Sequence, residues 1–345
     1  MNKLNDLQDL RVCFISDIPE NVKKYLINAL KGLSRVTIIF PKERTEEKLF
    51  KLIKDAQVLI GWRPSVELME HAKNMSVFIN PGAGIHHLLR DFREINKKRK
   101  VVLINGHGNS YFVAQHTVAL LLSFMNKIIP HHQWMKEGRW RTGDDDAVSV
   151  PLRFKNVGFL GYGAINKKVH KMLSGFNINF SILKRNWSKT EKTMPTVIKK
   201  YSHNQLHDFL KNIDILIIAV PVTKLTHNMI GEEELKLLGP EGILINVSRG
   251  EIVNQEALYK ALKNKTIFGA AIDVWYDYDP QSDEQGRKFP YKFPFHQLNN
   301  IILSPHRGYS PFSDLLRWNE VIENIKRIAH NRTDLLNIVD LNEGY

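Results

Sequence analysis

Two side chains suited to chemistry on a small anion each follow an apolar run that predicts a strand. Arg249 lies in I-N-V-S-R-G (245–250), and His306 lies in L-S-P-H-R-G (303–308). A guanidinium can bind a carboxylate through two parallel hydrogen bonds, and an imidazole can exchange a proton near neutral pH. A lone histidine is more often structural. An arginine and a histidine that both follow strands of one sheet indicate a catalytic edge, because parallel strands end at the same edge.

A glycine-rich turn predicts a site for the phosphates of a dinucleotide. Residues 156–166 read N-V-G-F-L-G-Y-G-A-I-N, an apolar strand followed by a helical pattern. Gly161 permits a sharp turn, and Gly163 lets backbone N–H groups approach a pyrophosphate. The third position of the G-x-G-x-x-G pattern is Asn166, which we expect to weaken the packing of the helix on the strand while leaving the phosphate site intact. Alone, the motif fits an ordinary strand–turn–helix about as well.

The residues after the next predicted strand indicate which dinucleotide is preferred. NAD-specific sites place an acid there, about 20 residues beyond the loop, to bind the ribose hydroxyls. Here the chain has Lys184 and Arg185. Two cations attract a 2′-phosphate that a carboxylate would repel, so they favour NADP, with NAD as the alternative. Two solvated cations at a strand end are the simpler interpretation of the same residues.

The elements that must position these residues alternate between strands and helices in both halves of the chain. Amphipathic helical stretches separate short apolar runs, which is typical of parallel sheets flanked by helices. The pattern predicts an α/β protein with two doubly wound Rossmann-like domains. The strands are expected at 12–15, 36–40, 58–61, 77–80, 101–104, 157–160, 178–183, 215–219, 243–246, 268–272 and 301–303.

Three other segments bear on the site. The loop N-P-G-A-G at 80–84 follows a predicted strand, where open α/β sheets bind ligands, although a plain turn accounts for it equally. Residues 109–129 form a helical pattern too apolar for an exposed helix, so we expect it to be buried between domains or subunits. The adjacent His131 and His132 do not share a helix face and have no carboxylate at ligand spacing. We therefore expect no metal site.

Composition limits the class of protein. A chain of 345 residues is long enough for two domains, and 43% hydrophobic with 25% charged residues is typical of a globular protein. The net charge of +13 indicates anionic partners. Because no nucleic-acid-binding motif accompanies that charge, a dinucleotide and a carboxylate substrate are favoured over nucleic acid. Cys13 is the only cysteine, which excludes an intrachain disulfide and a cysteine-based zinc site.

Hydropathy gives an expectation about location. The first ten residues contain no continuous apolar core, so we expect no signal peptide. The longest apolar runs, near 118–125 and 215–222, are much shorter than the roughly 20 residues that cross a bilayer. We therefore expect a cytoplasmic protein with no membrane partner.

Over nearly its whole length the chain resembles the D-isomer-specific 2-hydroxyacid dehydrogenase family. The resemblance implies a discontinuous substrate domain, 1–103 with 307–345, and an inserted dinucleotide-binding domain at 104–306. It also implies a homodimer built partly on the long apolar helix. The motifs that carry it, in order, are N-P-G-A-G-I (80–85), V-A-Q-H (113–116), G-x-G-x-x-N (161–166), V-P-x-T-x-x-T (220–226), I-N-V-S-R-G-E-I-V (245–253), A-A-I-D-V-W (270–275) and L-S-P-H-R-G (303–308).

The resemblance also implies roles for individual residues. Arg249 would bind the substrate carboxylate and polarise its carbonyl, and His306 would be the acid/base. Backbone N–H groups of Ala83 and Gly84 would hold the other face of the carboxylate, and Asp273 would contact the nicotinamide amide. The other implied coenzyme contacts are Gly161, Tyr162, Gly163, Ala164, Ile165, Lys184, Arg185, Val220, Pro221, Thr226, Val247 and Gly308.

The implied reaction is hydride transfer between NAD(P)H and a small 2-oxo acid such as glyoxylate or hydroxypyruvate. Formate dehydrogenation is less favoured, because the family's formate enzymes pair the histidine with a glutamine that is absent at that position. The alternative from another class is a dinucleotide-sensing regulatory protein with weak or no turnover, since corepressor members of the family act mainly through partners. The presence of both Arg249 and His306 favours the enzyme.

The chain departs from the family pattern at three places. The glutamate that usually pairs with the histidine, five residues after the position of Asp273, is Tyr278 here and is followed by Asp279. Either Asp279 replaces it with a one-residue shift, or Tyr278 supplies a neutral hydrogen bond and the pH optimum moves to lower pH; we favour Asp279. Gln115 replaces the glutamate of V-A-E-H. The lengthened loop at 277–295 is expected to reshape the mouth of the cleft.

Overall fold

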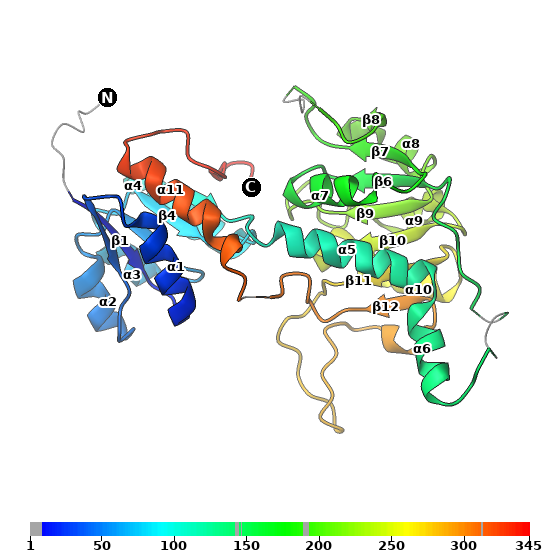
Figure 1. Ribbon diagram of the computed structural model, residues 1–345. Helices are drawn as coiled ribbons and strands as arrows, with labels where there is room; N and C mark the ends of the chain where they lie inside the picture. The colour runs from blue at the N-terminus through cyan, green and yellow to red at the C-terminus, as the bar shows by residue number, and fades with distance from the viewer. Residues whose placement is uncertain (1–8, 142–144, 146, 189–192, 312) are drawn as a thin grey trace. The chain divides into compact units, whose positions relative to one another are not determined.

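The computed structural model describes the chain except for residues 1–8, 142–144, 146, 189–192 and 312 (Figure 1). The chain divides into two compact units, Met1–Asn109 with Pro311–Tyr345 and Ser110–Ser310. These divisions lie a few residues beyond the predicted boundaries at 103 and 306. The assignment of the first unit to the substrate and of the second to the coenzyme stays a prediction.

The first unit contains a parallel sheet of five strands in the order β2-β1-β3-β4-β5. Every residue of β3 and β4 is buried, as in parallel sheets covered on both faces. Val12 and Phe14 pack with α1 and α11, whereas Cys13 packs on the other face with α2, α3 and α4. The elements are β1 Leu10–Phe14, α1 Glu20–Leu30, β2 Val36–Ile39, α2 Glu46–Ile53, β3 Val58–Ile60, α3 Val66–His71, β4 Val77–Asn80, α4 Leu89–Lys98, β5 Val102–Asn105 and α11 Asn319–Ala329.

The second unit contains a parallel sheet of seven strands in the order β12-β11-β10-β9-β6-β7-β8 (Figure 1). One face of the sheet packs against α5 and α7, and the other packs against α8, α9 and α10. The elements are α5 Ser110–Met125, α6 Ile128–Lys136, β6 Asn156–Leu160, α7 Ala164–Leu173, β7 Asn179–Leu183, β8 Ile198–Tyr201, α8 Leu206–Leu210, β9 Ile215–Ile218, α9 Glu232–Leu238, β10 Ile243–Asn246, α10 Gln255–Lys263, β11 Gly269–Ile272 and β12 Ile301–Leu303.

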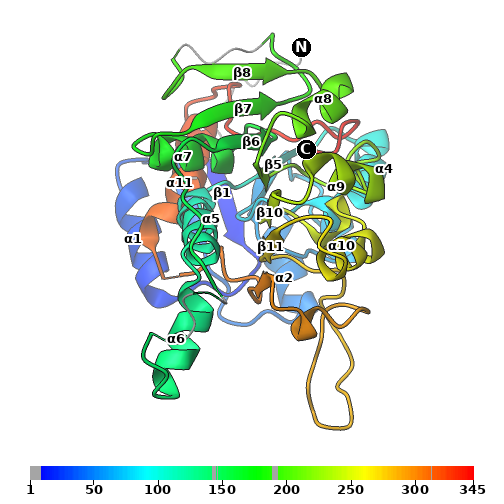
Figure 2. The same ribbon diagram turned by 90° about the vertical axis from the view of Figure 1, so that its right-hand side faces the viewer.

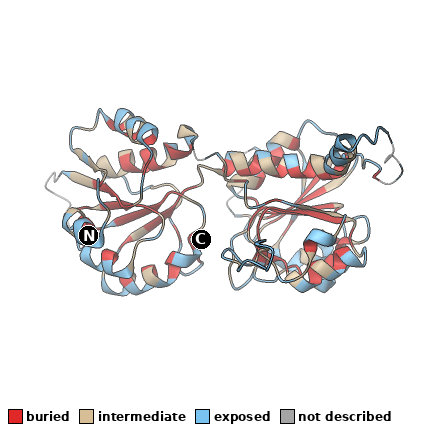
Figure 3. Cartoon of the chain, turned by 90° about the horizontal axis from the view of Figure 1, so that it is seen from below, coloured by how far each residue is buried: buried red, intermediate tan, exposed pale blue. Residues whose placement is uncertain are grey.

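Both units thus have the predicted α/β architecture, with buried strands between helices whose outer faces are exposed (Figure 3). Short 3-10 helices complete the connections. They are His86–Leu88, His203–Gln205, Gly250–Ile252, Phe295–Gln297 and Leu315–Trp318.

Strand β8 was not among the predicted strands. Its sequence, I-K-K-Y, has two exposed lysines and only one buried residue. The strand lies at the edge of the sheet and pairs with β7 alone. An edge strand buries little side-chain surface, so its sequence carries no apolar run from which a strand could be predicted.

The long apolar helix is shorter than the predicted 109–129. Helix α5 ends at Met125, because Lys127 adopts a left-handed backbone conformation with φ of 52°. Helix α6 then begins at a bend of 65°. Eight residues of α5 are buried, including Ala114 and Leu121, whereas α6 has none. Within the described residues no single helix is long and apolar enough to cross a membrane, and α5 with α6 reaches that length only as a bent pair.

Candidate active site

The predicted site residues of the second unit follow its strands at one edge of the sheet. Because all seven strands are parallel, their C-terminal ends meet at that edge, where open α/β sheets bind ligands. The glycine turn follows β6, Lys184 follows β7, Arg249 follows β10, Asp273 follows β11 and His306 follows β12. The sheet therefore brings these predicted residues together, although they are distant in sequence.

The glycine turn has the shape that a phosphate site needs. Gly161 has φ of +84°, and a Cβ there would stand 2.5 Å from Cγ1 of Val220 and 2.7 Å from the carbonyl oxygen of Ala219. Only glycine fits at that position. A Cβ on Gly163 would meet no atom within 4 Å, so the start of α7 is open to a ligand. The first N–H groups of a helix have no partner within the helix and bind anions. The turn thus fits a dinucleotide pyrophosphate.

Asn166, at the third position of the glycine pattern, joins α7 to the sheet through its side-chain amide; the expected weakening of the packing stays a prediction. The side chain is fully buried. Its Nδ2 donates a 2.7 Å hydrogen bond to the carbonyl oxygen of Gly161, and it also lies 3.5 Å from the carbonyl oxygens of Leu160 and Ile217. Direct hydrogen bonds from the helix to the strand ends replace the close contact that a third glycine would allow.

Cations gather around one indole ring beyond β7. Nζ of Lys184 lies 4.5 Å from the ring centre of Trp187, and Nζ of Lys200 lies 5.2 Å from the same ring. The indole Nε1 donates a hydrogen bond of 2.9 Å to the carbonyl oxygen of Tyr201, which fixes the ring against β8. Arg185 is exposed beside them. Sequence reasoning missed Lys200 because it lies on the unpredicted strand β8.

Arg249 lies in a loop that the side chain of Asn246 holds through hydrogen bonds. Oδ1 of the buried Asn246 accepts hydrogen bonds from the backbone N–H and the hydroxyl of Ser248, at 3.1 and 3.0 Å. Its Nδ2 donates to the carbonyl oxygen of Arg249 at 2.9 Å. Nη1 of Arg249 donates to the carbonyl oxygen of Ser248 at 2.6 Å. The guanidinium is half-buried, so it can meet a carboxylate outside bulk water.

His306 pairs with Tyr278 and not with Asp279, which corrects the sequence-based preference. Nδ1 of His306 lies 2.9 Å from the hydroxyl of Tyr278, and the two rings meet edge to face at 5.3 Å. Asp279 is exposed, and its backbone N–H donates to Oδ1 of Asp277. The histidine's partner is therefore neutral. Its loop takes a left-handed conformation at His306, with φ of 55°.

The carboxylate of Asp273 holds that loop. It is almost fully buried, and it accepts hydrogen bonds from the hydroxyl of Ser304 at 2.5 Å and from the backbone N–H groups of Arg307 and Gly308 at 2.7 and 2.9 Å. Nε2 of His116, from the V-A-Q-H motif, lies 3.2 Å from the same carboxylate. Burial alone would raise the pKa of Asp273, but these hydrogen bonds outweigh it and lower the pKa. Its implied contact with the nicotinamide amide stays a prediction.

The pKa of His306 is lowered in this environment. Burial, which disfavours the charged imidazolium, is the largest cause. The negative charge of Asp273 acts to raise the pKa, and the positive charge of Arg249 acts to lower it. With a neutral phenol as partner, nothing at Nδ1 restores the charge stabilisation that a glutamate would supply.

The remaining predicted coenzyme residues lie in the loop after β9 and beside β10. The hydroxyl of Thr226 donates to the carbonyl oxygen of Pro221 at 2.6 Å and accepts from the N–H of Thr223 at 2.8 Å, so it closes its own turn. Val220 is half-buried and Val247 is buried. These residues shape the edge of the sheet.

The loop with Ala83 and Gly84 belongs to the first unit. Nδ2 of Asn80 donates to the carbonyl oxygens of Gly82 and Gly84, and Nδ2 of Asn105 donates to that of Ala83 at 3.2 Å. The two asparagines end β4 and β5. They hold the loop through its carbonyl groups, at the C-terminal edge of the first sheet.

The connection from β11 to β12 extends as a long loop (Figures 1 and 2). An isolated bridge pairs Ser282 with Lys288, and an ion pair of 2.8 Å joins Asp283 to Arg287. Tyr278 lies at the base of this loop. The predicted effect of the loop on the cleft mouth stays a prediction.

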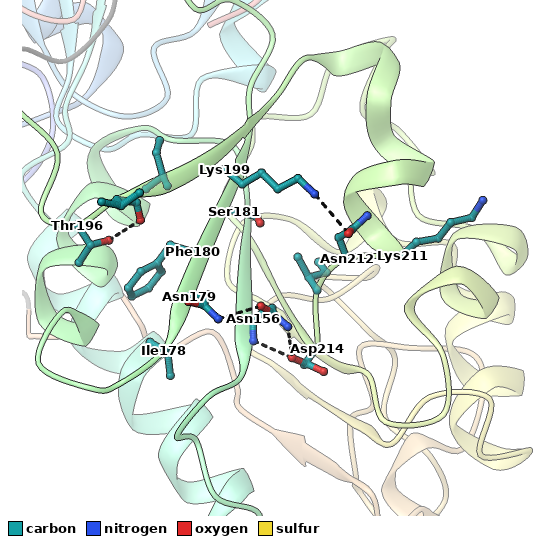
Figure 4. A pocket seen from close by; sticks show the side chains of 13 residues that line it. Asn156, Ile178, Asn179, Phe180, Ser181, Thr196, Lys199, Lys211, Asn212 and Asp214 are labelled. Carbon is teal, nitrogen blue, oxygen red and sulfur yellow. Dashed lines mark hydrogen bonds between the residues drawn. The ribbon is translucent and has the colours of Figure 1, made fainter.

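A hollow in the second unit lies at the other edge of the sheet (Figure 4). It is lined by the first residues of β6, β7 and β8 together with 211–214. Its polar groups pair with one another, since Nδ2 of Asn156 donates to Asp214 at 3.0 Å and Nζ of Lys199 donates to Asn212 at 3.3 Å. None of the predicted site residues lines it; those of the second unit follow its strands at the C-terminal edge.

Comparison with known proteins finds matches over most of the chain. Residues 118–308 match the family model described as D-isomer specific 2-hydroxyacid dehydrogenase, NAD binding domain. A glyoxylate reductase of Pyrococcus furiosus is 30% identical over 305 residues, covering 86% of this chain and 84% of the relative. A glyoxylate/hydroxypyruvate reductase of Arabidopsis thaliana, HPR3, is 26% identical over 323 residues, covering 92% and 91%.

A solved structure has the same fold. It is a D-isomer specific 2-hydroxyacid dehydrogenase from Xanthobacter autotrophicus Py2 in complex with NADPH and MES. The two superpose with a TM-score of 0.76 at 23% sequence identity, covering 98% of this chain and all of the other.

The neutral partner of His306 leads to a prediction. Replacing Tyr278 by glutamate should raise the pKa of His306 by about 1–3 pH units, because an adjacent carboxylate stabilises the imidazolium. An NMR titration of the His306 ring measures this pKa. Tyr278→Phe, which adds no charge, should change the pKa far less.

Asp279→Asn provides the matched control for the other candidate partner. Because Asp279 is not paired with the imidazole, this change should leave the pKa of His306 nearly as in the wild type. A pKa that falls clearly in Asp279→Asn and does not rise in Tyr278→Glu would contradict the pairing described here.

Proposed function

The chain belongs to the D-isomer specific 2-hydroxyacid dehydrogenase family, and we propose that it reduces a small 2-oxo acid such as glyoxylate or hydroxypyruvate with NADPH. It is an NAD(P)-dependent oxidoreductase of 2-oxo and 2-hydroxy acids. The observation that carries the proposed site is the placement of Arg249 and His306 after β10 and β12, at the sheet edge where the glycine turn begins.

The coenzyme site fits a dinucleotide on two grounds. Gly163 leaves open space at the start of α7, and Gly161 has no room for a side chain. The nicotinamide ring supplies the hydride when it is bound. Everything else in the reaction falls to side chains of the protein: binding the acid, orienting its carbonyl and moving one proton.

Arg249 and His306 divide that work. The guanidinium of Arg249 binds the substrate carboxylate and faces the carbonyl oxygen. As hydride reaches the carbonyl carbon, negative charge grows on the oxygen, and Arg249 stabilises it. Protonated His306 gives its proton to that oxygen, which completes the 2-hydroxy acid. The backbone N–H groups of Ala83 and Gly84, in the first unit, are proposed to hold the other face of the carboxylate.

The lowered pKa of His306 sets the pH dependence of this reaction. Reduction needs the imidazolium, and a lowered pKa means that the proton is lost at a lower pH than an ordinary histidine would lose it. As pH rises, the rate of oxo-acid reduction should therefore begin to fall at a pH below the ordinary pKa of a histidine. The reverse reaction, which needs neutral His306, should gain over the same range.

Charge at the ribose end supports NADP, with NAD as the alternative. Lys184 and Lys200 both approach the ring of Trp187, and Arg185 is exposed next to them. A cluster of cations can neutralise a 2′-phosphate, and the chain has no carboxylate at 184–186 to bind the ribose hydroxyls instead.

A homodimer is proposed from the surface of α6 and the segment that follows. Helix α6 has no buried residue. Ile128, Met135 and Trp140 are 55%, 56% and 71% exposed. Large exposed apolar side chains on one helix and just after it mark an interaction surface, and a second copy of the chain is the partner that the family resemblance implies.

The regulatory alternative is not favoured. A protein that only sensed a dinucleotide would have no need for an arginine and a histidine on one edge, with the histidine loop held by a buried carboxylate. Formate dehydrogenation is also less favoured, because the partner of His306 is a phenol and not a carboxamide.

The first test of the function is the reaction itself. Addition of glyoxylate or hydroxypyruvate should consume NADPH, followed by the absorbance of the reduced nicotinamide. His306→Ala should lower kcat/KM by about 10²–10⁴, the usual contribution of a general acid. Arg249→Lys keeps the charge but loses the two-pronged geometry, so it should raise the KM of the oxo acid.

His207→Ala is the control for that test. His207 is an exposed histidine in α8, hydrogen-bonded to Glu234 of α9, and it is not among the predicted site residues. The activity of the variant should equal that of the wild type. Tight coenzyme binding without turnover on a broad panel of 2-oxo acids would instead favour the regulatory protein.

The coenzyme preference has its own test. Replacing Lys184 and Arg185 together by serine should raise the KM for NADPH at least about tenfold, because two charge-assisted contacts with the 2′-phosphate are lost. The KM for NADH should change little. A wild-type preference for NADH would contradict the assignment to NADP while leaving the enzyme class intact.

The dimer is tested by light scattering after size-exclusion chromatography. The wild-type protein should have twice the mass of one chain. Ile128→Asp with Ile129→Asp should shift it toward the monomer, because charges would then lie in an apolar interface. Val197→Asp, at a residue that is 94% exposed elsewhere in the unit, is the control. A monomeric wild type would refute the proposal.

A further inference from the structure

A fully buried histidine lies beneath the glycine turn and takes no part in the reaction above. His170 is in α7, and its side chain has no exposed surface. Its Nδ1 lies 2.7 Å from the hydroxyl of Tyr162, the residue between the two glycines of the turn. Its Nε2 lies 2.8 Å from the hydroxyl of Thr196, which stands just before β8. One imidazole thus joins the turn, the helix and the edge strand.

The hydroxyl of Thr196 determines which atoms donate in these hydrogen bonds. The hydroxyl of Thr196 donates to the carbonyl oxygen of Val197 at 3.1 Å, so it accepts from Nε2–H of His170. Nδ1 of the neutral ring then carries a lone pair, which accepts the proton of the Tyr162 hydroxyl. In this row of hydrogen bonds each donor meets one acceptor, and the arrangement requires a neutral imidazole.

The surroundings keep the ring neutral. The imidazole packs against Phe180 at 4.3 Å and Phe159 at 5.6 Å between ring centres, and Tyr162 lies at 5.8 Å. Burial lowers the pKa of His170 to about 4. At neutral pH the ring is an uncharged hydrogen-bonding link inside an aromatic cluster, and it cannot serve as a proton donor to a substrate.

We propose that His170 is a positioning residue for the coenzyme: through Tyr162 it holds the backbone of 161–163 in the conformation that binds the pyrophosphate. This inference rests on the proposed function, since it assigns the turn to a dinucleotide. The tyrosine side chain is itself buried, so its ring and hydroxyl anchor the turn from inside the unit.

Two features show why such an anchor matters. Gly161 already has φ of +84°, and Gly163 has no side chain to fix its place. Glycine loses more conformational freedom on folding than any other residue, so a turn with two glycines needs contacts from its neighbours. Asn166 supplies one by donating to the carbonyl oxygen of Gly161. The Tyr162–His170 bond supplies the other, on the residue between the glycines.

The test compares three variants. Tyr162→Phe and His170→Phe each break the same hydrogen bond while keeping an aromatic ring in the cluster, and the third variant carries both changes. The Kd for NADPH is measured by fluorescence titration, together with kcat and the KM of the oxo acid at saturating NADPH. Each single variant should raise the Kd roughly five- to tenfold, the range expected for loss of the Tyr162–His170 hydrogen bond with a buried partner left unpaired. His170→Phe also removes the bond to Thr196, so its effect should be at least as large as that of Tyr162→Phe.

The other readouts separate positioning from mere stability. The rise in the Kd for NADPH should exceed any change in the oxo-acid KM measured at saturating NADPH, because within the described residues the hydrogen bonds of Arg249 and His306 involve neither Tyr162 nor His170. The double variant should bind NADPH no more weakly than the weaker single variant, because both changes remove the same bond. If His170→Phe does not fold, the Kd of Tyr162→Phe for NADPH is sufficient as the test, because this variant removes only the hydroxyl that bonds to His170.

Val169→Ala is the matched control. Val169 precedes His170 in α7 and is fully buried, so its truncation should lower the melting temperature without touching the turn. Its Kd for NADPH should remain near the wild-type value. If Tyr162→Phe and His170→Phe also keep that Kd and lose only stability, the inference is refuted while the proposed function stands. If the wild type binds neither NADPH nor NADH, both are refuted.

Discussion

Hydrogen bonds to the buried carboxylate of Asp273 are the interaction on which the proposed catalytic edge depends. Asp273 directly follows β11, and the donors to its carboxylate come from the loop after β12 and from α5. Burying a charge is costly unless hydrogen bonds replace the lost water, and here several donors surround two oxygens. The result is a fixed path for residues 304–308. His306 adopts a left-handed backbone conformation within that path. Asp273 therefore orients the His306 side chain indirectly, by binding the backbone N–H groups of the two residues that follow the histidine.

Burial and two charged residues at the same edge determine the pKa of His306. Asp273 favours the charged form of His306, while Arg249 and burial oppose it. The phenol of Tyr278 orients the ring at Nδ1 without adding a further negative charge. Orientation and charge stabilisation, which a glutamate would supply together, are thus separated in this protein. The imidazole is held in place, and its pKa is determined by the more distant charges and by burial.

The coenzyme side of the unit follows a parallel principle. In the G-x-G-x-x-G pattern a third glycine brings helix and strand together by removing a side chain. Here Asn166 brings them together by hydrogen bonding, and Tyr162 reaches back to His170. Both halves of the edge are therefore held by buried polar groups whose hydrogen bonds are directed at backbone or at one another, which specifies a single loop geometry.

The sequence by itself determined the two α/β architectures and the edge that carries Arg249 and His306. Apolar runs must be buried, and parallel strands must end together, so both conclusions follow from local pattern. Tertiary structure alone decided the rest. Strand β8 is polar because an edge strand buries little side-chain surface, and α5 ends at Met125, two residues before the left-handed Lys127. The choice of Tyr278 over Asp279 depends on a loop in which Asp277 binds the N–H of Asp279, a backbone path that no spacing in the sequence encodes.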